Sequence, residues 1–415
     1  MTSQVAILHY AAPPVVGGVE STIYHHARLL ARTGRQVVVI AGRGESFDPT
    51  VEFHLIPHMD SRHLDVLSVG QRLAQGRVDG GFAALRDRLV QELRPLLSTA
   101  AVSIVHNAVT LHKNLALTAA LRVLAEERVT RFIAWCHDFA WQDALYTSSL
   151  HAGYPWDLLR TPWPGVKYVV VSSHRRERLA TLIGLAPDQI EVIYPGISVT
   201  ELLKLESETV AIVDQLDLLA ADPLLLLPAR ITRRKNIEFA VRVIAALCDT
   251  RPAARLLVTG PPGAHNPSNL AYLQSLQSLR DTLGVTNRVH FLYEHGIDGE
   301  PLYVTDAMMA DFYKLADVLL FPSHREGFGI PVLEAALARI PVFAADIPSV
   351  RESAGGLAWL FDPEGDPTAV ARMLAELLNR DRVYRLRRRV LEEFTWSKVL
   401  EKRLYPLIEE VERDG

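Results

Sequence analysis

The sequence predicts an α/β protein of two domains, each with a parallel sheet, and three observations support this. The chain has 415 residues, which is long for a single hydrophobic core. Short apolar runs alternate with longer segments of helical apolar spacing along both halves of the chain. The two alternating series are similar in size, which is typical of two sheets whose parallel strands are connected by helices.

The composition excludes several classes of protein. Apolar residues make up 49% and charged residues 22% of the chain, and the net charge of −4 gives no basic surface for nucleic acid. Cys136 and Cys248 are too few for a disulfide framework or a CxxC metal site, which suits a reducing compartment. No apolar run approaches the roughly 18 residues of a membrane span, and the N-terminus lacks a signal-peptide pattern. We expect a soluble cytoplasmic protein, while contact with a membrane surface and the oligomeric state stay open.

The first expected strand, Val5–His9, leads through a glycine-containing loop into a helix. Gly17 and Gly18 lie in that loop, at the carboxyl end of the strand, where open α/β sheets bind ligands. The glycines allow close backbone approach by a ligand, although a flexible turn explains them equally well. No GxGxxG follows the strand, which disfavours a nicotinamide dehydrogenase. His25 and His26 on the helix are expected at the surface.

Two later strands of the first half end in polar residues. The further strands expected here are Gln36–Ala41, Glu52–Ile56, Ser103–His106, Arg131–Cys136 and the start of 166–179, with helices in 21–32, 62–97 and 111–128 and a helix capped by Ser172 or Ser173. His106 and Asn107 follow one strand, and His137 and Asp138 follow the next. Parallel strands bring such residues to one edge of a sheet, so they are candidate site residues. A structural role is the alternative for either histidine.

The second half begins with the strand Leu224–Leu227, followed by two cations, Arg230 and Lys235. Arginine offers a planar fork and lysine a mobile point charge, so this pair can bind an anion at the carboxyl edge of the second sheet. The alternative is a solvated basic face. The further elements expected are strands at Arg255–Gly260, Val289–Leu292, Val318–Phe321 and Pro341–Ala344, helices at Leu270–Leu283 and Ala307–Leu315, and a polar loop at 293–301 that can frame a nucleobase.

The stretch FPSHREGFGIPVLEA joins a buried strand to a helix. Gly327 and Gly329 let the loop bend, and Pro331 suits the first helical position, where no N–H is lost. The amides of Val332 and Leu333 are then expected to face outward at a helix N-terminus. Such a joint predicts an anion-binding site.

Two glutamates flank this loop. Glu326 and Glu334 stand in the arrangement EGFGIPVLE, and either alone is most simply a solvated acid. Together with Arg230, Lys235 and the turn VIYPG that ends at Gly196, they resemble the signature of the retaining GT-B glycosyltransferases of the family-four type, the glycosyl transferases group 1. The resemblance covers most of residues 1–400.

The resemblance implies a GT-B fold, in which two Rossmann-like domains face a central cleft and a C-terminal helix crosses back to the first domain. The implied boundaries are residues 1–197 with 394–412 for an acceptor-binding domain and 198–393 for a nucleotide-sugar-binding domain. This chain has Ser198 where the family commonly has an acid, a departure that affects no catalytic assignment.

The resemblance also implies roles for individual residues. His137, Glu326, Arg230 and Lys235 are expected to be catalytic, with Glu326 at the sugar hydroxyls and His137 near the sixth carbon of the sugar. The donor-binding set is completed by Glu334 at the ribose and by Gly17, Gly18, Gly327, Phe328, Gly329 and Ile330 near the phosphates. Acceptor contacts are expected from His106, Asn107 and Asp138.

The implied reaction transfers a hexosyl unit from a UDP-, GDP- or ADP-sugar to an acceptor hydroxyl, with retention at the anomeric carbon. No DxD metal-binding motif occurs in the sequence, so neither a metal ion nor another cofactor is expected. A nucleotide-sugar epimerase of the same fold and a non-catalytic sugar-nucleotide-binding protein are the alternatives. The sequence identifies neither the nucleotide, the sugar, the acceptor nor the linkage.

Overall fold

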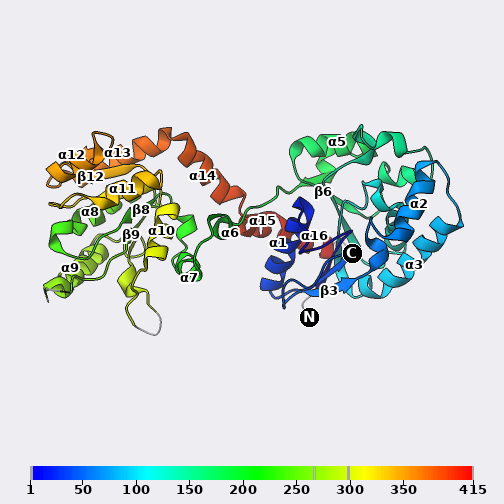
Figure 1. Ribbon diagram of the computed structural model, residues 1–415, viewed down its shortest axis with the longest axis horizontal. Helices are drawn as coiled ribbons and strands as arrows, with labels where there is room; N and C mark the ends of the chain where they lie inside the picture. Colours follow the sequence, from blue (N-terminus) through cyan, green and yellow to red (C-terminus); the bar gives the residue numbers. More distant parts are fainter. Residues whose placement is uncertain (1–2, 265, 267, 297–299, 414–415) are drawn as a thin grey trace. The chain divides into compact units, whose positions relative to one another are not determined.

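The computed structural model describes residues 3–264, 266, 268–296 and 300–413. It divides into two compact units, Met1–Ile197 with Phe394–Gly415, and Ser198–Glu393. In each unit a parallel sheet lies between layers of helices (Figure 1). The predicted α/β fold class with two parallel sheets is confirmed.

The first unit contains a seven-stranded parallel sheet in the order β3-β2-β1-β4-β5-β6-β7. Its strands are β1 (Gln4–His9), β2 (Gln36–Ala41), β3 (Glu52–Leu55), β4 (Ala100–His106), β5 (Arg131–Cys136), β6 (Lys167–Val170) and β7 (Ile190–Val192). Its helices before the domain boundary are α1 (Gly18–Arg32), α2 (Leu64–Ala74), α3 (Gly80–Leu97), α4 (Leu115–Glu126) and α5 (Ser173–Ile183). The strand order reverses between β1 and β4, so the loops after these two strands diverge and leave room for a ligand.

Local signals explain where several helices begin. Of the two predicted capping residues, Ser172 and Ser173, Ser172 caps α5 by accepting a hydrogen bond from the Arg175 amide. The helical stretch expected over 62–97, as one connecting helix or a pair, is a pair, because Gly76 adopts a φ of +75° and Asp79 then caps α3.

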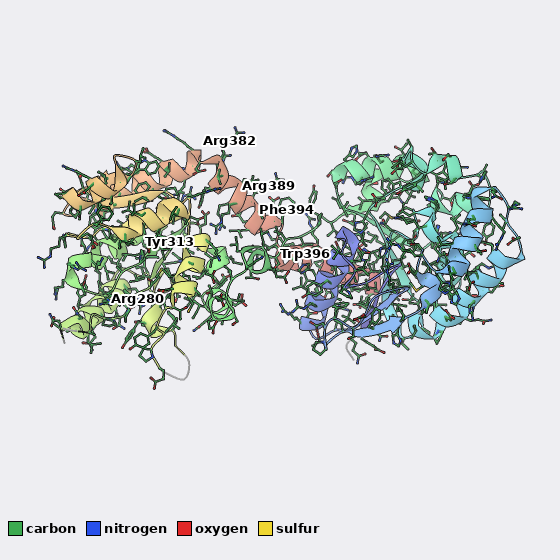
Figure 2. The ribbon with its side chains drawn as sticks, in the orientation of Figure 1. Arg280, Tyr313, Arg382, Arg389, Phe394 and Trp396 are labelled. Carbon is green, nitrogen blue, oxygen red and sulfur yellow. The ribbon has the colours of Figure 1, made fainter. Side chains whose placement is uncertain are left out.

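The C-terminal segment belongs to the first unit, as the resemblance implied. It consists of α15 (Trp396–Val399), a π-helical turn (Leu400–Leu404) and α16 (Tyr405–Arg413), and Figure 2 labels Trp396 at its start. Its apolar side packs with α1 against one face of the first sheet, while α2 to α5 cover the other face. Arg35 Nη1 lies 2.6 Å from Glu412 Oε1, and Lys167 Nζ lies 2.8 Å from Glu410 Oε1.

The second unit contains a six-stranded parallel sheet in the order β10-β9-β8-β11-β12-β13. Its strands are β8 (Leu224–Leu227), β9 (Arg255–Val258), β10 (Val289–Phe291), β11 (Val318–Phe321), β12 (Val342–Ala345) and β13 (Trp359–Phe361). Its helices are α6 (Val199–Leu203), α7 (Ser207–Gln215), α8 (Ile237–Cys248), α9 (Ser268–Thr282), α10 (Asp306–Leu315), α11 (Ile330–Leu337), α12 (Pro348–Ala354), α13 (Pro367–Arg380) and α14 (Arg382–Glu393). Here the order reverses between β8 and β11, so these two strands frame the position where this sheet can bind a ligand.

The strands of the second unit are apolar along their whole length because helices cover both faces of the sheet. All four residues of β8 are buried, two of them facing α8 and two facing the α10 side. In the loop expected to frame a nucleobase, residues 297–299 lie outside the described part of the chain. Among the described helices, none combines the length and apolar character that crossing a bilayer requires.

Candidate active site

Lys235 and Glu326 meet where the strand order of the second sheet reverses. Lys235 follows β8 and Glu326 follows β11, and Lys235 Nζ lies 2.5 Å from Glu326 Oε1. The two side chains are only 10% and 9% exposed, and the ammonium lies 5.2 Å from the centre of the Phe321 ring. The β8 and β11 loops are also joined by a hydrogen bond from the His324 amide to the Arg234 carbonyl. Two residues predicted to act separately therefore form one ion pair.

Arg230 lies on the same loop but in a different environment. Its side chain is exposed, and no hydrogen bond or ion pair to another described residue engages it. Arg230 and Lys235 line a hollow of about 400 Å³, together with Thr232, Gly263 and Asn269. Arg234 lines the same hollow, and three cations at one concave surface suit a ligand with more than one negative oxygen.

The glycine loop leads into α11 with a geometry that differs in detail from the prediction. Gly329, with a φ of +95°, precedes the helix, whereas Gly327 has no positive φ. The helix begins at Ile330, so Pro331 is its second residue and not its first. The predicted outward role of the Val332 amide is wrong, because that N–H donates to the Gly329 carbonyl at 3.0 Å.

The loop amides before the helix are the better anion donors. Within the described chain, the N–H groups of Gly327, Phe328 and Ile330 donate no hydrogen bond. Phe328 and Ile330 are 43% and 61% exposed, so their amides lie near the surface. Free amides at a helix N-terminus favour an anionic ligand.

Glu334 lies one turn inside α11 and has a partner that the sequence did not reveal. Its Oε2 accepts a hydrogen bond of 2.6 Å from the Tyr313 hydroxyl on α10, a residue labelled in Figure 2. Burial, together with the hydrogen bond and charge of Glu334, raises the pKa of Tyr313. The phenol therefore stays protonated and holds the carboxylate in one orientation.

In the first unit, His137 and His106 form a histidine pair at the ends of β5 and β4. His106 Nδ1 lies 3.1 Å from His137 Nε2, and the two rings stack at 5.4 Å. His106 is fully buried, whereas His137 is half-buried. Burial, and then the nearby charge of Arg175, lowers the pKa of His137 to about 4. His137 is thus a neutral imidazole near pH 7, held from behind by His106.

Asn107 braces the same edge. Its φ is +58°, and its side-chain oxygen accepts hydrogen bonds from the amides of His137 at 2.8 Å and Asp138 at 3.2 Å. The Asp138 carboxylate lies 3.4 Å from the Arg175 guanidinium. His106 and Asn107 are both buried, and the predicted contact of His106, Asn107 and Asp138 with an acceptor stays a prediction. His106 contacts the His137 ring, and Asn107 holds the backbone of His137 and Asp138. Of the three residues expected at the acceptor, Asp138 is the partly exposed one.

The expectation that His26 lies at the surface is wrong. His26 is 2% exposed, with its ring 4.8 Å from that of Trp135 and 5.5 Å from that of Trp396. His25 is partly exposed and stacks on Trp396 at 4.9 Å. The helical spacing could have indicated this burial, because His26 lies on the same face of α1 as the buried residues Ile23, Ala27 and Leu30.

His9, at the end of β1, is a further buried histidine that sequence reasoning did not select. Its Nδ1 lies 3.0 Å from the His106 carbonyl, and its Nε2 lies 4.0 Å from a Glu20 oxygen. Burial is the main reason that its pKa is lowered to about 4. A histidine that ends the first strand of an α/β sheet was the signal that could have identified it.

Gly17 and Gly18 lie where β1 leads into α1. Gly17 has an extended backbone, and a Cβ there would collide with the Glu20 carboxylate. A Cβ on Gly18 would meet no atom within 4 Å. Gly18 therefore borders open space at the N-terminus of the 15-residue helix α1. A ligand that approaches this backbone needs such space.

Comparison with known proteins gives matches to both halves of the chain. The model described as glycosyltransferase family 4 matches residues 16–201, and the model described as glycosyl transferases group 1 matches residues 212–393. D-inositol 3-phosphate glycosyltransferase of Streptomyces scabiei is 31% identical over 196 residues, which are 46% of this chain and 41% of that protein. Mannosylglucosylglycerate synthase of Petrotoga mobilis is 26% identical over 278 residues, 62% of each protein. The chain spans about two fifths to half of the first three matched relatives.

Solved structures also show similarity along the whole chain. A glycosyltransferase from Rickettsia africae is 14% identical, covers 100% of both chains and has a TM-score of 0.40. Sucrose-phosphate synthase from Thermosynechococcus elongatus is 16% identical, with 98% and 99% coverage and a TM-score of 0.38.

The two family models follow one another along the chain, and each falls almost wholly within one structural unit. The group 1 match contains Arg230, Lys235, Glu326 and Glu334, which the structure gathers around β8 and β11. The chain belongs to the GT-B family of glycosyltransferases.

Proposed function

We propose that the protein is a retaining hexosyltransferase that uses a nucleotide diphosphate sugar as donor, an acceptor hydroxyl as nucleophile and no metal ion in the chemical step. The observation that carries this proposal is the Lys235–Glu326 ion pair, which lies beside the exposed Arg230 where the second sheet reverses its strand order. A diphosphate bound there gains the charges of Arg230, Arg234 and Lys235. The free amides of the glycine loop after β11 offer further donors for an anion.

The division of labour follows from these contacts. Arg230 and the loop amides stabilise the charge that grows on the departing phosphate, and Lys235 adds its charge while holding Glu326. Glu326, fixed by Lys235, is placed to accept hydrogen bonds from sugar hydroxyls. Glu334, oriented by Tyr313, is placed to accept them from a ribose. These roles need positioning and charge stabilisation, not a protein nucleophile.

The bond changes balance without a further reactant. The bond between the anomeric carbon and the phosphate oxygen breaks, and a bond to the acceptor oxygen forms on the same face. The acceptor proton passes to the departing phosphate oxygen. A double displacement would need paired carboxylates about 5 Å apart, whereas Glu326 faces a lysine and Asp138 faces an arginine.

The experiment identifies the donor first and then the stereochemistry. Thermal-shift screening of UDP-, GDP- and ADP-sugars selects the donor, and NMR of the first-formed product is recorded with excess EDTA. D-inositol 3-phosphate, which several matched relatives carry in their names, is the first acceptor to assay. We expect an α-linked product from an α-linked donor, at a rate that EDTA leaves unchanged.

Each other result removes a defined part of the proposal. A β-linked product would contradict retention. If EDTA abolishes activity and only a divalent ion restores it, transfer is not metal-independent. Isomerised or free sugar without transfer to any acceptor favours an epimerase. If Glu326→Gln and Glu334→Gln both leave donor KM, kcat and sugar selectivity unchanged, the site is misassigned.

A further inference from the structure

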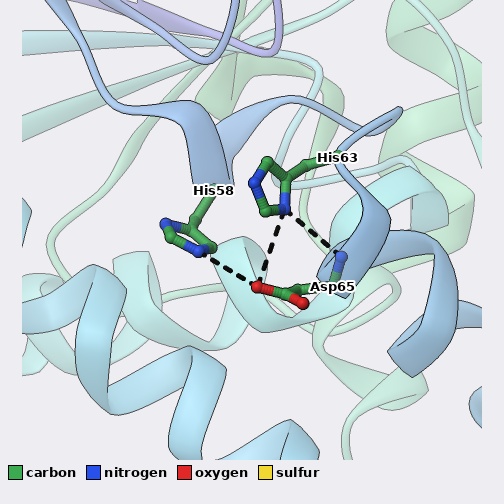
Figure 3. Close-up of side chains that lie close together, drawn as sticks. All are labelled: His58, His63 and Asp65. Atoms are coloured by element: carbon green, nitrogen blue, oxygen red, sulfur yellow. Dashed lines mark hydrogen bonds and ion pairs between the residues drawn. The ribbon is translucent and has the colours of Figure 1, made fainter.

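A second cluster of polar side chains lies in the first unit, just beyond the carboxyl end of β3. His58 lies in a short 3-10 helix (Pro57–Met59), His63 caps α2, and Asp65 lies in the first turn of α2. Figure 3 shows both imidazoles directed at the same carboxylate oxygen. None of these residues takes part in the transfer proposed above.

We propose that His58, His63 and Asp65 bind a divalent transition-metal ion of the Zn²⁺ type. Asp65 Oδ2 lies 3.3 Å from His58 Nε2 and 3.8 Å from His63 Nδ1, and the three ligand atoms all lie within 4.8 Å of one another. Tetrahedral Zn²⁺ with bonds of about 2.0–2.1 Å requires ligand atoms roughly 3.3 Å apart, so the three side chains must move closer together around the ion. Three protein ligands leave a fourth position for water.

The protein alone does not satisfy the hydrogen-bonding capacity of His58. Its Nε2 lies 3.3 Å from a carboxylate oxygen of Asp65, which can only accept, and 3.2 Å from Arg88 Nη1, which can only donate. No single protonation state of Nε2 suits both neighbours. The buried Nδ1 has no hydrogen-bond partner in the part of the chain that the structure describes. A metal ion bound to Nε2 resolves the conflict at that atom.

Two existing contacts must yield to the ion, and both can do so. The Arg88 side chain is 57% exposed and has Glu92 as an alternative partner at 3.5 Å. The hydrogen bond from the Asp65 amide to His63 Nδ1 is long, at 3.3 Å, and lies at the exposed start of a helix. His63 is 30% and Asp65 63% exposed, so an ion can reach them from solvent.

The position of the cluster indicates a structural role for the ion. The Asn114 side chain donates to the His58 carbonyl at 2.9 Å, which joins the cluster to the segment after β4. Residues of α2 and residues 112–116 line a hollow of about 330 Å³ in the first unit. An ion at the start of α2 therefore stabilises one wall of this hollow in the first unit.

The test is calorimetric titration of the full chain, stripped with chelator, using ZnCl₂ alone. We expect one Zn²⁺ per chain, with affinity at least 10- to 100-fold weaker in Asp65→Asn and in His63→Ser. His63→Ser removes the imidazole but keeps a residue type that caps helices. His54→Ala is the matched control, because His54 also lies beside an acid, Glu52 at 2.7 Å, but belongs to no group of three candidate ligands among the described residues.

Arg88→Gln gives a further readout. It removes a positive charge beside His58 Nε2, so it should tighten Zn²⁺ binding. If the wild type, Asp65→Asn and His63→Ser bind Zn²⁺ with equal affinity, the proposed site is wrong. It is also wrong if His54→Ala loses as much Zn²⁺ affinity as Asp65→Asn and His63→Ser. If EDTA lowers transferase activity through this site, His63→Ser is insensitive to EDTA; sensitivity retained in that variant counts instead against metal-independent transfer.

Discussion

At the residue scale, Arg230 and Lys235 carry the same charge but differ in what they do for the fold. Lys235 is buried and neutralises the buried Glu326 carboxylate, whereas Arg230 is exposed on the same loop. Removing one member of a buried ion pair leaves an uncompensated charge, which typically costs about 3–5 kcal/mol. Removing an exposed arginine carries no such cost.

We therefore predict that Arg230→Ala and Lys235→Ala both lower kcat/KM by roughly 10²-fold, the effect of losing one charge-stabilising donor. Only Lys235→Ala should also lower the free energy of unfolding, measured by urea denaturation. The double variant Lys235→Met with Glu326→Gln should recover most of that stability and no activity, because it removes both buried charges.

Arg242→Ala is the control, since Arg242 is an exposed arginine on the neighbouring helix α8. It should change neither activity nor stability. Unchanged turnover in folded Arg230→Ala would contradict the diphosphate role, and unchanged stability in Lys235→Ala would contradict the structural role of the ion pair.

At the scale of elements, the ends of β1, β4 and β5 and the middle of α1 bring four histidines together. Three of them, His9, His26 and His106, are buried, and His137 is half-buried. Burial is the largest cause that lowers each pKa, to about 4 for His9 and His137, to about 3 for His26 and well below the usual value for His106. Unfolding lets each histidine return to its ordinary pKa near 6.5.

This arrangement predicts how stability depends on pH. Between pH 6.5 and about 4 the unfolded chain binds protons that the folded chain does not, so stability falls as the pH falls. Each such histidine contributes a slope of up to about 1.4 kcal/mol per pH unit. His26→Phe should reduce the slope between pH 4 and 6 by up to this amount, measured by urea denaturation at several pH values.

His174→Gln is the matched control for the pH experiment, because His174 is exposed on α5. It should leave the slope unchanged. A slope in His26→Phe equal to that of the wild type would mean that His26 is not kept neutral by its burial among Trp135 and Trp396.

At the scale of the whole molecule, the chain returns to its first unit after completing its second. The C-terminal segment contributes fully buried Leu404 and Ile408 to the core that also contains α1 and one face of the first sheet. The first unit is therefore complete only when residues from both ends of the chain are present.

We predict that Ile408→Ala destabilises the first unit by about 2–5 kcal/mol, the usual cost of truncating a buried aliphatic side chain. Hydrogen–deuterium exchange of the full chain should become faster in β1 and α1 and stay unchanged in β8 and α8. Leu374→Ala, which empties an equally buried position on α13, should give the reverse pattern. Faster exchange in both units with either variant would show that they unfold together.

The sequence by itself determined the class of the fold and the positions of many elements. The strands Gln36–Ala41, Arg131–Cys136, Leu224–Leu227 and Val318–Phe321 have the predicted bounds. These strands are buried and end at turn residues, so their signal is local. The sequence also indicated which segments carry the candidate site residues, because parallel strands place the residues that follow them at one edge of the sheet.

Tertiary structure alone decided which of these residues have partners. Lys235 and Glu326 are separated by 91 residues and Tyr313 and Glu334 by 21, and nothing local indicates either contact. Likewise, His26 is buried because Trp396 arrives from the far end of the chain to pack against it. Local spacing specifies which face a residue lies on, but burial and pairing depend on what long-range packing places against that face.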